Sequence, residues 1–152
     1  MRYTGMLLQI AFLFLAGCTV SKTICPCEAP EIIRLGDKQV EINARVFLTD
    51  TTATRKMKVT IWLATTDETP LPSHFNADSY YLRSANLSRE AFEGKLLVLK
   101  TDSAKGKMEL ETIDAPLWLK GELVDVAVHI VDSHGKVHFI KKDALPVKAL
   151  ED

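Results

Sequence analysis

Two pairs of side chains in this sequence have the chemistry to bind a soft metal ion or to change redox state. Cys25 and Cys27 flank a single residue, Pro26, and His129 and His138 lie in a segment rich in β-branched residues. Thiolate sulfur and imidazole nitrogen are ligands that copper and zinc prefer in proteins. Two sulfurs alone do not complete a tetrahedral zinc shell, so the cysteine pair is equally compatible with a reducible disulfide or with a link to another chain.

The relative position of the two histidines depends on the register of one predicted β-hairpin, within residues 122–142. A register that pairs Ile130 with His138 places the two histidines on opposite faces. A register that pairs Ile130 with Val137 places His129 opposite His138, with β carbons about 5 Å apart, close enough to share a copper or zinc ion. Burial favours the second register, because the first inserts His138 into an apolar face. Partly exposed histidines that only titrate near pH 6.5 are the simpler interpretation.

Aromatic residues form a second group of candidates. Trp62 falls on the polar side of an alternating segment, and a proline-rich segment, 65–78, follows it directly and predicts a long surface loop. Phe75 lies in this loop, and Tyr80 and Tyr81 come just after it. Exposed aromatic side chains are typical of protein-binding surfaces, so these four residues are predicted to form one. The alternative is that the loop covers Trp62.

Composition and motifs argue against catalysis and against nucleic acid. The sequence contains no G-x-S-x-G, H-E-x-x-H, P-loop or G-x-G-x-x-G motif. Its 152 residues carry a formal charge of −1, and no run rich in lysine and arginine interrupts them. We therefore expect a protein that is not an enzyme, does not bind nucleic acid and needs no cofactor, apart from the copper or zinc considered above.

The first 17 residues have the pattern of an export signal. A single positive charge at Arg2 precedes an apolar run from Met6 to Leu15 and two small residues. The run is shorter than the roughly 20 residues that a transmembrane helix needs, which favours a removable signal over a membrane anchor. The residues Leu15-Ala16-Gly17-Cys18 resemble the lipobox of bacterial lipoproteins, which is an apolar residue, two small residues and a cysteine.

The resemblance to bacterial lipoproteins implies that Cys18 receives a diacylglyceryl thioether, that residues 1–17 are removed as a signal peptide and that the new amino terminus is acylated. Several acyl chains would hold the mature chain firmly to a bilayer. Thr19, and not Asp, follows the cysteine. By the sorting habit of the family in Gram-negative cells, this implies the periplasmic face of the outer membrane, with the inner membrane or the cell surface as the alternative location.

The elements that must position the candidate residues are strands. Residues 18–38 contain two prolines and a glycine without periodicity, and are predicted to be the lipidated cysteine and a flexible tether before a domain at 39–152. In that domain, a two-residue alternation of apolar and polar side chains predicts strands. They are expected at Val40–Leu48, Lys56–Leu63, Tyr80–Arg83, Lys95–Thr101 and Lys107–Ile113, with two more in Glu122–Lys142.

Seven or eight short strands and almost no helical periodicity predict an all-β fold, an immunoglobulin-like two-sheet sandwich, with a small closed β-barrel as the alternative. On such a scaffold we expect a non-enzymatic protein-binding, adaptor or assembly factor. Its partners would be the membrane, through the lipid anchor, and an unidentified envelope protein. The alternative function is a periplasmic metal-binding or redox protein that uses Cys25, Cys27, His129 and His138.

Overall fold

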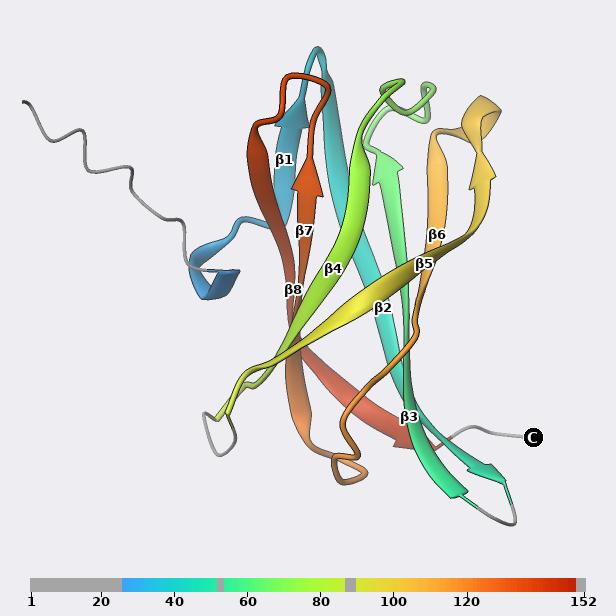
Figure 1. The fold of residues 1–152 in the computed structure, drawn as a ribbon, viewed down its shortest axis with the longest axis vertical. Helices are drawn as coiled ribbons and strands as arrows, with labels where there is room; N and C mark the ends of the chain where they lie inside the picture. Colours follow the sequence, from blue (N-terminus) through green and yellow to red (C-terminus); the bar gives the residue numbers. More distant parts are fainter. Residues whose placement is uncertain (1–25, 52–53, 87–89, 150–152) are drawn as a thin grey trace, which may run out of the picture.

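The computed structural model describes residues 26–51, 54–86 and 90–149. In these ranges the chain forms strands and two short 3-10 turns (Figure 1). None of the helical segments found there is long and apolar enough to cross a membrane. The strands are β1 Ile32–Leu35, β2 Lys38–Thr51, β3 Thr54–Thr65, β4 Asn76–Ser84, β5 Phe92–Asp102, β6 Lys107–Thr112, β7 Leu123–Val131 and β8 Val137–Ala149, and the turns are η1 Pro26–Glu28 and η2 Ser103–Lys105.

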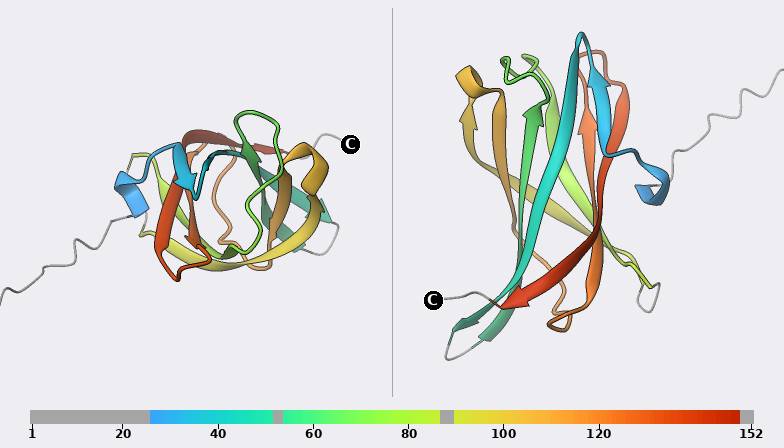
Figure 2. Two further views of the ribbon diagram at one scale, coloured as in Figure 1. Left: turned by 90° about the horizontal axis from the view of Figure 1, so that it is seen from above. Right: turned by 180° about the vertical axis from the view of Figure 1, so that it is seen from behind.

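Seven of the eight strands close into one barrel. Their order is β2, β3, β6, β5, β4, β7, β8 and back to β2. The remaining strand, β1, pairs with the first residues of β2. Figure 2 shows the closed ring from above. The all-β class is therefore confirmed, and the architecture is the small closed barrel. The two-sheet sandwich is wrong, because β8 pairs with β2 and thereby joins the strands into one closed sheet.

One neighbour pair in the barrel is parallel, and the number of strands explains why. Strands that alternate in direction around a closed ring must be even in number, so a ring of seven contains at least one parallel pair. That pair is β2 and β8, which meet only at Val46–Val147, Phe47–Lys148 and Leu48–Ala149. The other neighbours in the ring are antiparallel.

Side-chain alternation directs one face of each strand into the barrel. The interior contains large apolar residues from all seven barrel strands and no layer of polar ones: Val40, Ile42, Val59, Ile61, Leu63, Tyr80, Leu82, Leu96, Leu110, Val126, Val128, Ile130 and Ile140. A ring of seven strands encloses a space that side chains can fill, and here these apolar residues fill it, so the barrel has a packed core.

Tyr80 is the largest fully buried side chain, and its contacts tie β4 to β5 and to the segment after β6. Its ring is completely buried and packs against Phe92, with the ring centroids 6.1 Å apart. Its hydroxyl donates to the carbonyl oxygen of Asp114. Opposite Tyr80 stands Gly94, where an added β carbon would lie 2.5 Å from the tyrosine ring. Burial raises the pKa of the Tyr80 hydroxyl above its usual range, and the nearby Asp114 charge adds to this.

The folded chain begins earlier than the predicted boundary at residue 39. β1 pairs with the start of β2, and its residues Ile33 and Leu35 are buried in the core. Before it, η1 is tied to β8, because the Lys141 amino group donates to the carbonyl oxygen of Cys27 (2.9 Å). Four residues are too few to show an alternation, so the prolines and the glycine nearby predict a tether in place of the strand.

The hairpin of β7 and β8 adopts the register that was not favoured. Ile130 pairs with His138, and His129 pairs with Phe139, so the predicted pairing of His129 with His138 is wrong. The pair formed by Ile130 and His138 lies next to the end of the hairpin. There the imidazole does not enter the core but reaches Asp132, with 2.8 Å between Nε2 and Oδ2. The cost that argued against this register is thereby avoided.

Candidate protein-binding surface

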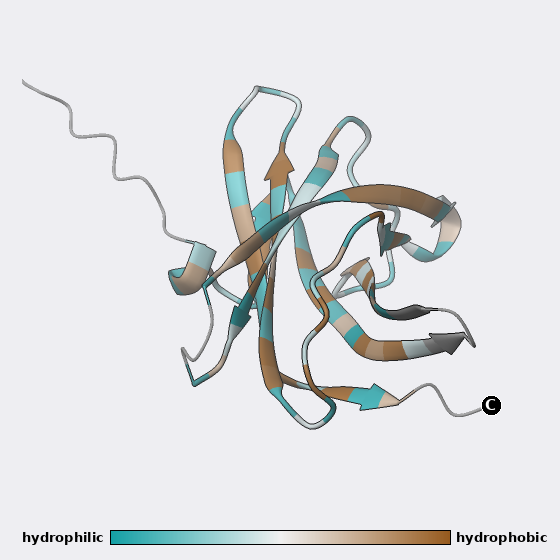
Figure 3. Ribbon diagram, turned by 60° about the horizontal axis from the view of Figure 1, so that its bottom comes forward, coloured by the Kyte–Doolittle hydropathy of each residue, from teal (hydrophilic) through white to brown (hydrophobic). Residues whose placement is uncertain are grey.

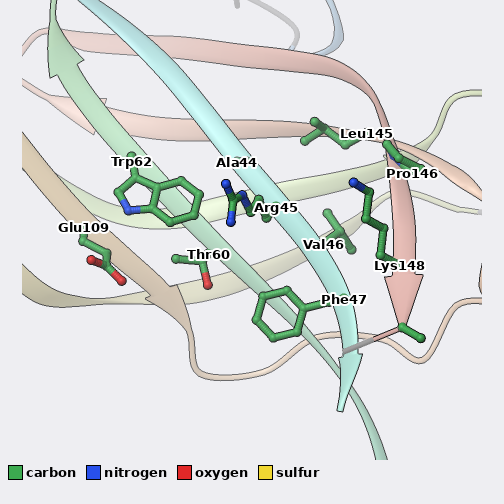
Figure 4. Close-up of a pocket in the computed structure, with 11 residues that line it drawn as sticks. Ala44, Arg45, Val46, Phe47, Thr60, Trp62, Glu109, Leu145, Pro146 and Lys148 are labelled. Atoms are coloured by element: carbon green, nitrogen blue, oxygen red, sulfur yellow. The ribbon is translucent and has the colours of Figure 1, made fainter. Parts of the chain in front are cut away.

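A groove on the outside of the barrel surrounds Trp62. Its volume is about 520 Å³, and β2, β3, β6 and β8 contribute to it. We call this surface the Trp62 groove. It is lined by Ala44, Arg45, Val46, Phe47, Thr60, Trp62, Glu109, Leu145, Pro146, Lys148 and Ala149 (Figure 4).

The Trp62 groove exists because β2 has two different neighbours along the same edge. β1 pairs with β2 as far as Glu41, and β8 pairs with it only from Val46 onward. In the described part of the chain, no strand pairs with this edge between those two points. The backbone amide of Ala44 is satisfied instead by the side-chain oxygen of Asn43 (2.9 Å).

A bend in β8 sets the far wall of the groove. Ala144 has a positive φ of 53°, and the pairing of β7 with β8 shifts register between Val124 and Val126. The buried Asp125 holds this irregularity, because its carboxylate accepts from the Ala144 amide (3.0 Å) and from the Arg83 guanidinium (3.0 Å). After the bend, β8 turns toward β2 and presents its outer side chains to the groove.

Trp62 is half-buried on the outer face and is not covered by the loop that follows it. The Arg45 guanidinium lies over the indole ring, 5.6 Å from its centroid. Phe47, also half-buried, adds a second aromatic side chain on β2. Arg45 and Lys148 outnumber the one carboxylate of the lining, Glu109, so the groove combines aromatic surface with a small positive excess. This combination suits an apolar side chain next to a carboxylate.

The other predicted aromatic residues do not join Trp62. Tyr80 is fully buried, and Phe75 packs partly against the core. Tyr81 lies on the outer face of β4, where its ring meets Phe139 edge-on, with centroids 5.8 Å apart. β4 is on the opposite side of the ring from β2 and β3. The single patch of four residues is therefore wrong, and the residues that accompany Trp62 are Phe47 and Arg45.

These companions were missed, although the sequence carries a signal for them. Arg45 and Phe47 occupy the polar face of their strand, as Trp62 does on the next strand. In the observed register, Arg45 pairs with Thr60 and Asn43 pairs with Trp62, so these side chains share one outer face. Each strand of the predicted hairpin has a large aromatic residue at an outward position, and this pattern could have been used to predict the groove.

The two histidines lie on opposite faces of the β7–β8 hairpin, and each contacts its own carboxylate. His129 Nδ1 is 2.9 Å from Asp78 Oδ1, and His138 Nε2 is 2.8 Å from Asp132 Oδ2. Burial opposes ionisation of Asp78, but its contacts with His129 outweigh burial and lower the pKa of this carboxyl. Among the described residues, no three His, Cys, Asp or Glu side chains are grouped so that they could hold a metal ion.

The predicted cysteine positions lie at or before the start of the folded chain. Cys27 belongs to η1 and is disulfide-bonded. Cys18 and Cys25, the other two cysteines of the sequence, fall outside the described residues. The partner of Cys27 is therefore not among the described residues, and the predicted lipidation of Cys18 stays a prediction.

Comparison with known proteins adds nothing to this geometry, because no family model, no curated protein and no solved structure matches the chain.

Proposed function

We propose that this chain is a bacterial lipoprotein that acts as a non-enzymatic protein-binding, adaptor or assembly factor, and that it binds an envelope protein through the Trp62 groove. The observation that carries this proposal is the groove itself. It has a volume of about 520 Å³, it is lined by Trp62, Phe47 and Arg45 among others, and it lies on the outside of a barrel with a packed core. Lipidation at Cys18 and location at the periplasmic face of the outer membrane belong to the same proposal. They rest on the lipobox residues.

The chemistry of the lining indicates what the partner presents. Tryptophan and arginine are the residue types that contribute most to protein–protein binding energy when they lie in a partly closed site. Trp62 and Phe47 would take an apolar side chain, while Arg45 and Lys148 would pair with a carboxylate. The partner segment is therefore an exposed stretch that carries an apolar residue beside an acidic one.

The alternative function, a metal-binding or redox protein, has less support in this geometry. Its histidine pair is divided between two faces of the hairpin, and each imidazole contacts a separate aspartate. That alternative would have to rest on Cys25 and Cys27 alone, and because Cys27 is disulfide-bonded, it could bind copper or zinc only after reduction.

Site-specific photo-cross-linking in living cells tests the proposed function. A photoreactive residue is placed at Glu109, inside the groove, or at Lys136, an exposed position in the β7–β8 turn. We expect one envelope protein to cross-link at position 109 and not at position 136. Identification of the adduct should locate the contact in an apolar stretch with an acidic residue.

Two serine variants provide the matched comparison. Trp62→Ser should abolish the adduct, whereas Tyr81→Ser, which removes a half-buried aromatic side chain on the other side of the barrel, should leave it unchanged. Thermal unfolding of both variants checks that each still folds. The proposal fails if the adduct at position 109 persists in folded Trp62→Ser, or if both cross-linking positions give the same adducts.

A further inference from the structure

The second half of β5 is a free strand edge. Its first residues, Phe92–Lys95, pair with β4, but from Leu96 onward β5 pairs only with β6. Figure 1 shows β5 diverging from β4 as it runs toward β6. In the described part of the chain, no strand pairs with the β4 side of residues 96–102. An edge of this kind offers backbone donors and acceptors to another strand.

The pairing of β5 with β6 shows which backbone amide and carbonyl groups of β5 point toward the free edge. The carbonyl of Lys95 accepts from the Ile113 amide (3.2 Å), so the backbone groups of Lys95 point toward β6. Alternation directs the amide and carbonyl groups of Leu96 and Val98 to the free side. The bulge between Val98 and Lys100 inserts one residue and reverses the alternation, so the groups of Thr101 also face the free side.

Apolar side chains remain exposed along the same stretch. Leu97, Val98 and Leu99 are 53%, 46% and 47% exposed, respectively. In Figure 3 this part of β5 forms a brown band, and the end of the strand before η2 is teal. Soluble proteins protect free edges with charges and bulges, and here a bulge is present but three successive apolar residues are left in water. The edge is therefore suited to a partner strand.

We propose that this edge pairs with the same edge of a second copy, antiparallel and related by a twofold axis. One register satisfies both the backbone and the charges. It places Leu96 opposite Thr101, two residues whose backbone groups both face the free side. It also places Lys95 opposite Asp102, and the twofold axis repeats this ion pair.

The side chains of that ion pair lie on the same face of the joined sheet. Leu96 points into the barrel, so its neighbour Lys95 points out. Lys100 and Glu109 pair with each other and point out. Asp102 lies two residues after Lys100 on the same strand and pairs with Lys107, so its side chain points out as well. Sliding the partner by two residues would instead set Lys95 against Lys100, a like-charge contact that destabilises the pairing. In the proposed register the charges of β5 are therefore complementary to those of the second copy.

Charge reversal tests this dimer, with the full-length protein in a density-matched detergent and sedimentation equilibrium as the measurement. Over about 1 μM to 1 mM, a range that covers weak interfaces, we expect the mass of the wild type to rise toward twice that of the monomer. Lys95→Asp alone, or Asp102→Lys alone, creates two like-charge contacts and should weaken the dimer about tenfold or more. A wild type that stays monomeric over the whole range overturns the proposal.

Mixing the variants separates the charge effect from loss of folding. An equimolar mixture of Lys95→Asp and Asp102→Lys restores opposite charges at both contacts, so a heterodimer should form although neither variant dimerises well alone. The double variant should also recover the dimer. The Asp102 carboxylate also accepts a hydrogen bond from the Lys105 amide (3.3 Å), and every variant with Asp102→Lys loses this bond. Because the double variant loses it too, a recovered dimer must come from the restored charge pairs. Failure of both the mixture and the double variant to recover the dimer overturns the assigned register.

This dimer goes beyond the proposed function and does not depend on it. The lining of the Trp62 groove includes no residue of β5, although Glu109 at its β6 wall pairs with Lys100 of β5, so the edge that would form the dimer lies outside the groove. Trp62→Ser should therefore leave dimerisation unchanged, and the charge variants should still give the adduct at position 109. If Trp62→Ser removes the dimer, the interface is the groove and not β5.

Discussion

Asp132 shows how a single carboxylate decides local structure in this protein. One of its oxygens accepts from the backbone amides of His134 (2.9 Å) and Lys136 (3.0 Å), and the other contacts His138 Nε2 (2.8 Å). The hydrogen bond from His138 and those from the two amides lower the pKa of Asp132 from 3.8 to about 2. The ionised carboxylate therefore organises the turn and holds His138 at the end of the barrel.

This lowered pKa predicts an acid-dependent loss of stability. As the pH falls from about 5 to 2, the unfolded chain binds a proton at Asp132 before the folded chain does, so the contribution of the carboxylate is present at about pH 5 and is lost as the pH falls toward 2. The stability difference between wild type and Asp132→Asn should have its full value near pH 5 and should shrink between pH 4 and 2. Urea unfolding across this range measures it.

The exposed Asp37, in the turn between β1 and β2, provides the control. Asp37→Asn should follow the wild-type pH curve. A difference between wild type and Asp132→Asn that stays the same down to pH 2 would contradict the assigned role of the carboxylate.

The same residues explain why the register of the hairpin was not predictable. Burial alone favours Val137 opposite Ile130, because it treats His138 as a polar side chain with no partner. The partner is Asp132, six residues away in the turn, and the sequence does not reveal that the turn brings its carboxylate to the imidazole. Local polar contacts therefore outweighed the apolar pattern at this position.

At the scale of elements, β1 is the strand that most changes the expected organisation. It has four residues, and Leu35 is 1% exposed while Ile32 is 48% exposed. If β1 is part of the core, Leu35→Ala should lower the free energy of unfolding by about 3 kcal/mol, as for other buried leucines. Ile32→Ala removes a similar side chain from the same strand and should cost less than about 1 kcal/mol.

Chemical unfolding of the two alanine variants measures this difference. Equal and small effects would mean that residues before 39 behave as the tether that the sequence predicts. A large effect of Ile32→Ala alone would contradict the observed direction of the β1 side chains.

Long alternating segments were predictable, whereas β1 and the end of β8 were not. The alternation over Val40–Leu48 and Lys56–Leu63 correctly predicts the inner faces of β2 and β3 and the outward position of Trp62. β8 continues through Pro146 to Ala149, beyond the predicted hairpin. A proline interrupts the strand pattern in sequence, but here it follows a bend where the ladder is already irregular.

At the scale of the whole molecule, the strands were largely predictable but their closure was not. A sandwich and a barrel contain the same alternating segments, and they differ in which distant strands become neighbours. Here the parallel contact of β2 with β8 closes the ring, and it involves only three residue pairs. The sequence pattern of β2 or of β8 taken alone does not indicate this contact. The Trp62 groove depends on the same contact, so only the outward direction of Trp62 could be predicted.

The proposed anchor limits where this barrel can act. Seven residues lie between Cys18 and Pro26, where the described chain begins, and the eight steps from Cys18 to Pro26 span at most about 28 Å when fully extended. If Cys18 carries the lipid, the barrel must therefore lie within a short distance of the membrane surface. A partner of the Trp62 groove must then expose its apolar and acidic segment close to the same membrane.

Two substitutions at the lipobox test this arrangement by membrane fractionation and by labelling with radioactive palmitate. Cys18→Ser removes the sulfur that takes the lipid, so the protein should lose the label and leave the membrane fraction while its thermal unfolding stays unchanged. Thr19→Asp keeps the lipid but places aspartate after the cysteine, so by the sorting habit of lipoproteins the labelled protein should move from the outer to the inner membrane. The adduct at position 109 should then disappear if the partner resides at the outer membrane. Retention of Cys18→Ser in the membrane fraction would show that another segment attaches the chain.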